Sequence, residues 1–108
     1  MHERLTIIYV TCGSEVESRK IADGLVRDKL VACVNIVSVE SLFEWKMRVE
    51  DKKEWLLIIK TLKSRYKEIE DYIKNHHSYE CPEIIAQDIS AVSDEYAAWV
   101  SSVCKSEG

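Results

Sequence analysis

Short runs of β-branched and aromatic residues alternate along the chain with segments in which apolar residues recur every three or four positions. The runs predict four strands, at residues 4–11, 31–45, 54–61 and 83–90. The periodic segments predict three helices, at residues 13–30, 64–77 and 93–104. The predicted order is therefore strand, helix, strand, strand, helix, strand and a terminal helix.

A serine stands at the predicted start of each helix. Ser14 is followed three residues later by Glu17, which is the sequence signature of a capping box. Ser64 and Ser93 occupy the same position before the second and third helices. The apolar stripes that we expect to pack inward are Tyr66, Ile69 and Ile73 in the second helix, and Tyr96, Trp99 and Val103 in the third.

This order predicts an α+β fold of the ferredoxin-like type, βαββαβ, with a four-stranded antiparallel sheet, helices on one face and an extra C-terminal helix. With 108 residues the chain is expected to form a single domain, residues 1–108, that buries one core. Three glycines and one proline indicate short loops. We expect the polar segment 46–53 to be a hairpin connection into which the strands extend partway.

The second predicted strand is too long for a compact chain of this size. Residues 31–45 would span roughly 50 Å at about 3.3 Å per residue, whereas the radius of gyration expected here is only about 13 Å. The strand must therefore bend or project, and a projecting ribbon exposes Phe43, Trp45 and Trp55. Large exposed apolar side chains and unpaired strand edges favour a partner, most simply another copy of the chain in a closed ring.

Composition and charge exclude several classes of partner. The formal net charge is −4 and charged residues of both signs are intermixed, so the sequence predicts no basic surface for nucleic acid or anionic membranes. No stretch approaches the length that crosses a membrane, and the N-terminus does not resemble a signal peptide. The four cysteines form no C-x-x-C pair and are expected to be free thiols. We therefore expect the protein in the cytoplasm.

The segment "NHHSYECPE", residues 75–83, concentrates the candidate chemistry. One interpretation is structural: imidazole suits a helix C-terminus, and Pro82 limits the continuation of the helix. The other is functional, because imidazole nitrogen and carboxylate oxygen together suit copper or zinc. Two ligands do not make a tight site, so a third would come from elsewhere in the fold or from another subunit. Cys81 is a weaker candidate for that role.

Several motifs in order make the chain similar to the CutA family of divalent-cation-tolerance proteins. The motifs are "LVACVNIV", the aromatic run ending in Trp45, "LLIIKT", "HSYECPEII" and "YAAWV". The resemblance covers residues 5–103. It implies a ferredoxin-like subunit in a tight homotrimer, with the long second and third strands pairing between subunits. It also implies a link to copper and other divalent cations, and an architecture similar to that of PII-type signalling proteins.

The resemblance also implies site residues. In some members a first-strand cysteine, a histidine at the end of the second helix and the glutamate of the "PE" pair are proposed to bind copper. Those positions correspond to Val10, His76 and Glu83 here, with His77 as a second imidazole. Cys12 lies two residues beyond Val10 and is expected to begin the loop. Phe43, Trp45, Trp55 and Tyr79 are the expected trimer-interface residues. The sequence departs from the family pattern at Gly13, Met47 and Ser78.

Three functions follow from this resemblance and from the residues. The first is a trimeric divalent-cation tolerance protein that binds copper or another divalent cation weakly through His76, His77 and Glu83, with no cofactor required for folding. The second is a PII-like signalling module that binds a small anion at the helix start near Ser14, although Glu15 and Glu17 oppose an anion there. The third is a non-catalytic trimeric scaffold that anchors partner proteins. No catalytic constellation can be assembled, so no enzyme is expected.

Overall fold

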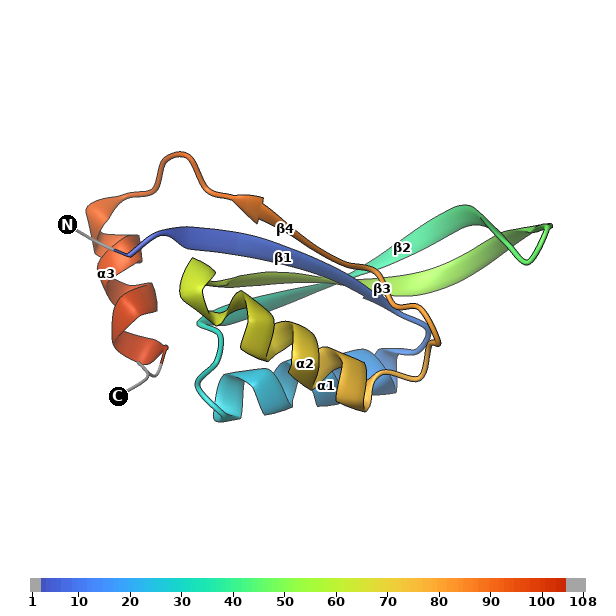
Figure 1. The fold of residues 1–108 in the computed structure, drawn as a ribbon, viewed down its shortest axis with the longest axis horizontal. Coiled ribbons are helices and arrows are strands. Elements are labelled where there is room, and N and C mark those ends of the chain that lie inside the picture. Colours follow the sequence, from blue (N-terminus) through green and yellow to red (C-terminus); the bar gives the residue numbers. More distant parts are fainter. Residues whose placement is uncertain (1–2, 105–108) are drawn as a thin grey trace.

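The computed structural model describes residues 3–104, which contain four strands, three α-helices and one short 3-10 helix (Figure 1). The elements are β1 (Leu5–Cys12), α1 (Glu15–Arg27), β2 (Cys33–Trp45), β3 (Arg48–Leu62), η1 (Lys63–Arg65), α2 (Tyr66–His76), β4 (Ile84–Asp88) and α3 (Asp94–Val103). The predicted βαββαβ order and the additional terminal helix are both confirmed. No helix among these residues is long and apolar enough to cross a membrane.

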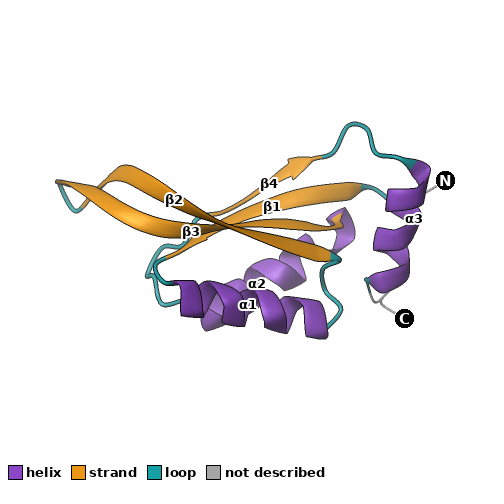
Figure 2. Cartoon of the chain, turned by 180° about the vertical axis from the view of Figure 1, so that it is seen from behind, coloured by secondary structure: helices purple, strands orange, loops and turns teal. Residues whose placement is uncertain are grey.

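The strands form one antiparallel sheet in the order β2-β3-β1-β4. Helices α1 and α2 lie side by side on one face of this sheet, and α3 packs at its end (Figure 2). Because side chains alternate along a strand, the buried Ile8, Val10 and Leu57 point toward α1 and α2. Their neighbours point to the opposite face, which those two helices leave open. This open face comprises Ile7, Tyr9, Val37, Val39, Leu56, Ile58 and Ile85.

The core under the two helices confirms the stripe predicted for α2. Ile69 and Ile73 are fully buried and contact the same cluster as Ile21 and Leu25 of α1. Burying side chains of this size stabilises the fold by about 1.5–3 kcal/mol each. A second, smaller cluster joins Leu5 and Leu62 to the inner side of α3.

Two of the three predicted helix caps are confirmed, and one is wrong. The backbone N–H of Glu17 donates to Ser14 Oγ at 3.1 Å, and the N–H of Tyr96 donates to Ser93 Oγ at 3.2 Å. Ser64 instead lies within η1, and its hydroxyl donates to Glu3 Oε1 at 2.8 Å. The 3-10 turn that follows β3 delays the start of α2, which therefore begins without a side-chain cap.

The inward stripe predicted for α3 is also partly wrong. Trp99 is 44% exposed, whereas Tyr96 is partly buried and packs against the cluster of Leu5 and Leu62, as predicted. The fully packed residues of this helix end are Ala97, Val100 and Cys104. These small side chains at i, i+3 and i+7 let the helix approach the sheet closely, and Trp99 then lies on the outer surface.

The β2–β3 ribbon projects beyond the helices, as its length predicted (Figure 1). The molecule is 48 Å long but only 25 and 20 Å across. The strands remain paired up to Trp45 and Arg48, so the predicted hairpin is confirmed, and its connection is a two-residue turn at Lys46 and Met47. Both turn residues have positive φ, at 52° and 66°, the conformation of a type I′ turn. Phe43 and Trp45 stay 37% and 41% exposed on this ribbon.

Candidate functional site

The histidine-rich segment joins α2 to β4 at the end of the sheet from which the ribbon projects (Figure 1). Helix α2 ends at His76, and His77 already has extended backbone angles, φ −92° and ψ 141°. The segment therefore ends the helix, as predicted. It also lies beside the C-terminal end of β1, because His77 bonds to Thr11 across 66 positions of sequence.

His77 has a buried and fully bonded ring. Its side chain has no exposed area. Nε2 lies 2.8 Å from the carbonyl oxygen of Thr11, and Nδ1 lies 3.0 Å from the backbone nitrogen of Tyr79. A carbonyl only accepts and a backbone N–H only donates, so the proton sits on Nε2 and Nδ1 carries the free lone pair. The hydrogen-bond network therefore assigns a neutral ring with a defined tautomer.

Three potential ligands converge on this ring. A ligand atom from each of Cys12, Glu17 and His77 lies within 4.8 Å of the other two; we call these residues the Cys12 cluster. Glu17 Oε2 is 3.6 Å from His77 Nδ1. The same carboxylate accepts hydrogen bonds from the backbone N–H and the hydroxyl of Ser78, both at 3.2 Å. Glu17 thus holds the segment after α2 instead of returning to Ser14 as a capping box would.

Each member of the cluster comes from the end of a regular element. Cys12 is the last residue of β1 and is fully buried, so the expectation that it begins the loop is wrong. Because β1 continues through it, Cys12 faces the helices as Val10 does, two positions earlier. Glu17 lies in the first turn of α1. Strand alternation and the position of Glu17 were the available signals, but the sequence alone did not show that the two residues meet.

Burial changes the protonation of the thiol. Burial, followed by the nearby carboxylates of Glu17 and Glu54, raises the pKa of Cys12 to about 12. Each of these effects disfavours the thiolate. The cysteine is therefore a protonated thiol at neutral pH when no cation is bound.

The other two predicted ligands lie outside the Cys12 cluster. His76 is exposed, its Nδ1 is 2.7 Å from the carbonyl oxygen of Tyr72, and its ring stacks on the Tyr72 ring at 4.1 Å. Glu83 lines a separate pocket with Glu54, and burial and then the Glu54 charge raise the pKa of Glu83. Within residues 3–104 the Cys12 cluster is the only close group of three such ligands. A role for His76 or Glu83 as a ligand stays a prediction.

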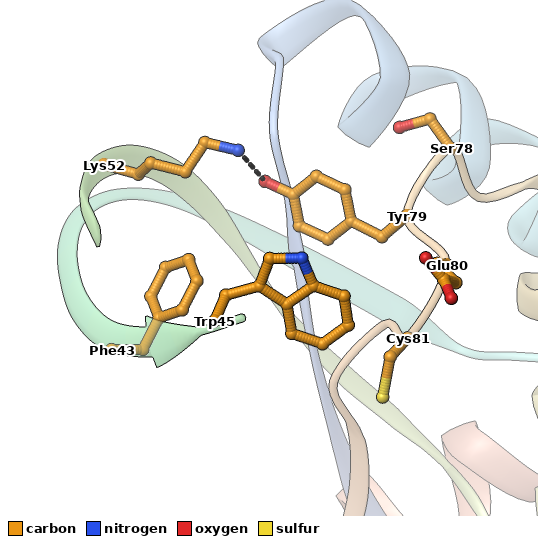
Figure 3. Close-up of a pocket in the computed structure, with 7 residues that line it drawn as sticks. All are labelled: Phe43, Trp45, Lys52, Ser78, Tyr79, Glu80 and Cys81. Atoms are coloured by element: carbon orange, nitrogen blue, oxygen red, sulfur yellow. Dashed lines mark hydrogen bonds between the residues drawn. The ribbon is translucent and has the colours of Figure 1, made fainter. Parts of the chain in front are cut away.

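An aromatic pocket of about 370 Å³ lies between the ribbon and the same segment. It is lined by Phe43, Trp45, Lys52, Ser78, Tyr79, Glu80 and Cys81 (Figure 3). The Tyr79 hydroxyl donates to Glu54 at 2.8 Å, and Lys52 Nζ lies 4.9 Å from the centre of the Tyr79 ring. A Cβ on Gly13 would lie 2.7 Å from the Tyr79 hydroxyl, so a side chain there would displace the phenol.

This pocket brings together three of the four residues predicted for a trimer interface. Phe43, Trp45 and Tyr79 all line it. Trp55 does not, because it pairs with Cys12 across the β1–β3 ladder and its ring lies under Lys53 Nζ at 5.7 Å. The assignment of all four residues to an interface stays a prediction.

The fold and this corner define a class of protein: a ferredoxin-like α+β subunit with a long projecting hairpin and a histidine segment at its base. The sequence profile of the CutA1 divalent ion tolerance protein family matches residues 6–103. The chain belongs to this family.

Relatives from several kingdoms agree with this assignment. The chloroplastic protein CutA of Arabidopsis thaliana is 39% identical over 97 residues, which are 89% of this chain and 53% of that protein. The divalent-cation tolerance protein CutA of Archaeoglobus fulgidus is 38% identical over 86% of this chain and 91% of its own length. The chain thus spans about half the length of the plant relative and nearly all of the archaeal one.

Solved structures show the same fold. CutA1 from Oryza sativa superimposes with a TM-score of 0.95 at 32% identity, covering 98% of each chain. The periplasmic divalent cation tolerance protein CutA from Archaeoglobus fulgidus gives a TM-score of 0.92 at 35% identity, covering 94% of this chain and 99% of that one. The predicted ferredoxin-like architecture is therefore confirmed.

Proposed function

We propose that the protein is a homotrimer that binds divalent cations, copper among them, and contributes to cation tolerance without catalysing a reaction. Membership of the divalent ion tolerance family supports the general role. The observation that carries the proposal is that potential metal ligands and exposed aromatic side chains lie at the same end of the sheet. The donor-rich segment 75–83 lies at the base of a ribbon whose aromatic side chains are exposed in the single chain.

The surface of the single chain supports self-association. Leu42, Met47 and Val49 are between 74% and 92% exposed on the ribbon. On the open face of the sheet, Val37 and Ile85 are 42% and 55% exposed. Exposed apolar side chains on both faces of the ribbon and on the open face favour an interface, and β2 also offers an unpaired edge along its whole length. In a closed ring, neighbouring copies of the chain would bury the exposed apolar side chains and pair with the edge of β2.

The chemistry of the corner favours cations over anions. Two carboxylates, Glu15 and Glu17, occupy the first turn of α1, where a PII-like anion site would lie. Glu54 and Glu83 add two more acidic groups beside Tyr79. An anion would meet carboxylates at each of these positions, whereas imidazole nitrogen and carboxylate oxygen are ligands for copper and zinc.

One experiment tests the assembly and the cation separately. Sedimentation at micromolar concentration is expected to give the mass of three chains. Isothermal titration of the same sample with Cu²⁺ is expected to give a saturable heat. His76→Ala, His77→Ala and Glu83→Ala then show which predicted ligands contribute. A well-folded monomer would contradict the proposed trimer. The absence of heat with the wild type would contradict the proposed cation binding.

A scaffold that anchors partner proteins is the second candidate, and the aromatic pocket favours it. Phe43, Trp45 and Tyr79 form an amphipathic wall of the type that recurs at protein interfaces. If this function holds, titration gives no heat while the trimer persists. We also propose a cytoplasmic location, in keeping with four free cysteines; cell fractionation with a periplasmic and a cytoplasmic marker tests it.

A further inference from the structure

We propose that Cys12 Sγ, a Glu17 carboxylate oxygen and His77 Nδ1 form a three-ligand site for a thiophilic divalent cation of the Zn²⁺ and Co²⁺ type. This inference rests on the proposed function and deepens it, because it names the ligand set and the class of cation. Two of the three ligands were not among those expected from the sequence. The site differs from the one implied by the family resemblance, whose cysteine position is Val10 in this chain.

The ligand atoms are already gathered by the fold. They lie within 4.8 Å of one another on the ends of β1, α1 and α2. Tetrahedral zinc with typical sulfur and nitrogen bond lengths places those two ligands about 3.6 Å apart. The sulfur and nitrogen atoms therefore need to approach by about 1.2 Å at most. Cys12 and the His77 side chain are both fully buried, whereas the Glu17 side chain is 19% exposed, so the site reaches solvent on the Glu17 side.

The hydrogen bond on the far side of the His77 ring is the one that metal-binding histidines use. Such histidines donate their second ring N–H to a carboxylate, a backbone carbonyl or a water, which fixes the tautomer and the ring direction. Here Nε2–H donates to the carbonyl of Thr11 at 2.8 Å. The lone pair on Nδ1 therefore accepts the N–H of Tyr79 at 3.0 Å, and Glu17 Oε2 lies 3.6 Å from the same nitrogen.

A cation would displace a hydrogen bond that holds the corner when no cation is bound. Nδ1 gives up the N–H of Tyr79, whereas Glu17 can keep its two bonds from Ser78, because each carboxylate oxygen has a second lone pair. The Cys12 S–H bond breaks, a sulfur–metal bond forms and the proton leaves to solvent. Three protein ligands leave the fourth position to water. Cation binding therefore competes with the Tyr79 hydrogen bond and with the proton of Cys12.

Cobalt provides a direct test because a Co²⁺–thiolate bond gives a charge-transfer absorption band in the near ultraviolet. We expect the reduced wild-type protein to show this band, saturating at one Co²⁺ per chain, and Zn²⁺ to abolish it by competition. Cys12→Ala is expected to remove the band. Glu17→Gln keeps the thiol and the side-chain volume, and is expected to weaken Co²⁺ binding at least tenfold.

Cys81→Ala is the matched control, because Cys81 is an exposed thiol outside the cluster and its loss should leave the band unchanged. Circular dichroism checks that each variant is folded. If Cys12→Ala does not fold, Co²⁺ binding by Glu17→Gln tests the site instead. A band that survives in Cys12→Ala, or full affinity in Glu17→Gln, would overturn the site. Heat from a divalent cation without any thiolate band would refute this ligand set and leave the proposed function standing. If the protein shows neither heat on titration nor a thiolate band, both this site and the proposed cation binding are refuted.

Discussion

The hydroxyl of Tyr79 donates a hydrogen bond to Oε2 of Glu54 at 2.8 Å, and Glu54 is only 4% exposed. This bond links the segment between α2 and β4 to the base of the projecting ribbon. Removing it with Tyr79→Phe leaves a buried carboxylate without that donor. We expect the free energy of unfolding to fall by about 1–3 kcal/mol, measured by urea denaturation at a fixed chain concentration.

The matched control for this bond is the double variant Tyr79→Phe with Glu54→Gln. Glutamine removes the buried charge, so the second substitution is expected to restore part of the loss caused by the first. An equal or larger loss in the double variant would show that the bond does not carry the effect.

The same phenol makes stability depend on alkaline pH. Burial, and then the hydrogen bond and the charge of Glu54, hold the pKa of Tyr79 above its usual value of 10.0. The folded protein therefore keeps a proton that the unfolded chain loses, so stability falls as the pH rises above about 10. The decline in unfolding free energy between about pH 9 and pH 11 is expected to be shallower in Tyr79→Phe than in the wild type. Equal slopes would contradict the prediction.

The strands and helices were predictable because each has its own local pattern. Ile69 and Ile73 repeat at the helical period and are buried, and the length of β2 indicated a projecting ribbon before the structure showed it. Two local errors have physical causes. Ser64 is a residue type that caps helices, but it lies inside the 3-10 turn that follows β3 and so does not precede α2. Trp99 has the hydrophobicity of a core residue, but the smaller Ala97 and Val100 pack against the sheet.

The candidate site was less predictable because its members are distant in sequence. His77 was identified by its motif, but its buried partner Cys12 depends on where β1 ends and on how α2 approaches it. The periodicity of a single sequence does not predict that the ends of β1, α1 and α2 lie close together. Glu17 shows the difficulty most clearly: its spacing from Ser14 indicated a capping box, yet its carboxylate binds Ser78, 61 positions away.

Assembly is expected to depend on the aromatic side chains of the ribbon. Trp45→Ser removes a large side chain that is 41% exposed, so the fold of the single chain should change little while the trimer weakens. Sedimentation equilibrium is expected to show dissociation at concentrations where the wild type remains assembled. Val16→Ser is the control, because Val16 is 79% exposed on α1 and is not part of the ribbon. Dissociation in both variants, or in neither, would contradict a specific role for Trp45.

The two adjacent histidines are expected to differ sharply in their structural roles. His77→Ala removes a buried ring with hydrogen bonds on both nitrogens, so the Thr11 carbonyl and the Tyr79 N–H each lose this partner. We expect a loss of about 2–4 kcal/mol in unfolding free energy. His76→Ala affects an exposed ring and is expected to cost less than about 1 kcal/mol. Urea denaturation of both variants checks this, and similar losses would contradict the hydrogen-bond assignment of His77.

The turn of the hairpin offers a substitution that should stabilise the protein. Met47 has φ of 66° and is 92% exposed, so it adopts a left-handed conformation without burial to compensate. That conformation costs a residue with a side chain roughly 1–2 kcal/mol, while glycine loses about 0.5–1 kcal/mol of additional chain entropy on folding. Met47→Gly is therefore expected to raise the free energy of unfolding by about 0.5–1 kcal/mol.

The control for the turn is a glycine placed in the same ribbon where the backbone is extended. Glu44 lies in β2 opposite Val49, so Glu44→Gly adds the entropy cost without relieving any strain and is expected to destabilise by about 0.5–1 kcal/mol. The two glycine variants should thus shift the unfolding midpoint in opposite directions, at the same chain concentration and with the same sedimentation behaviour. A shift of the same sign in both would mean that the left-handed backbone at Met47 carries no measurable strain.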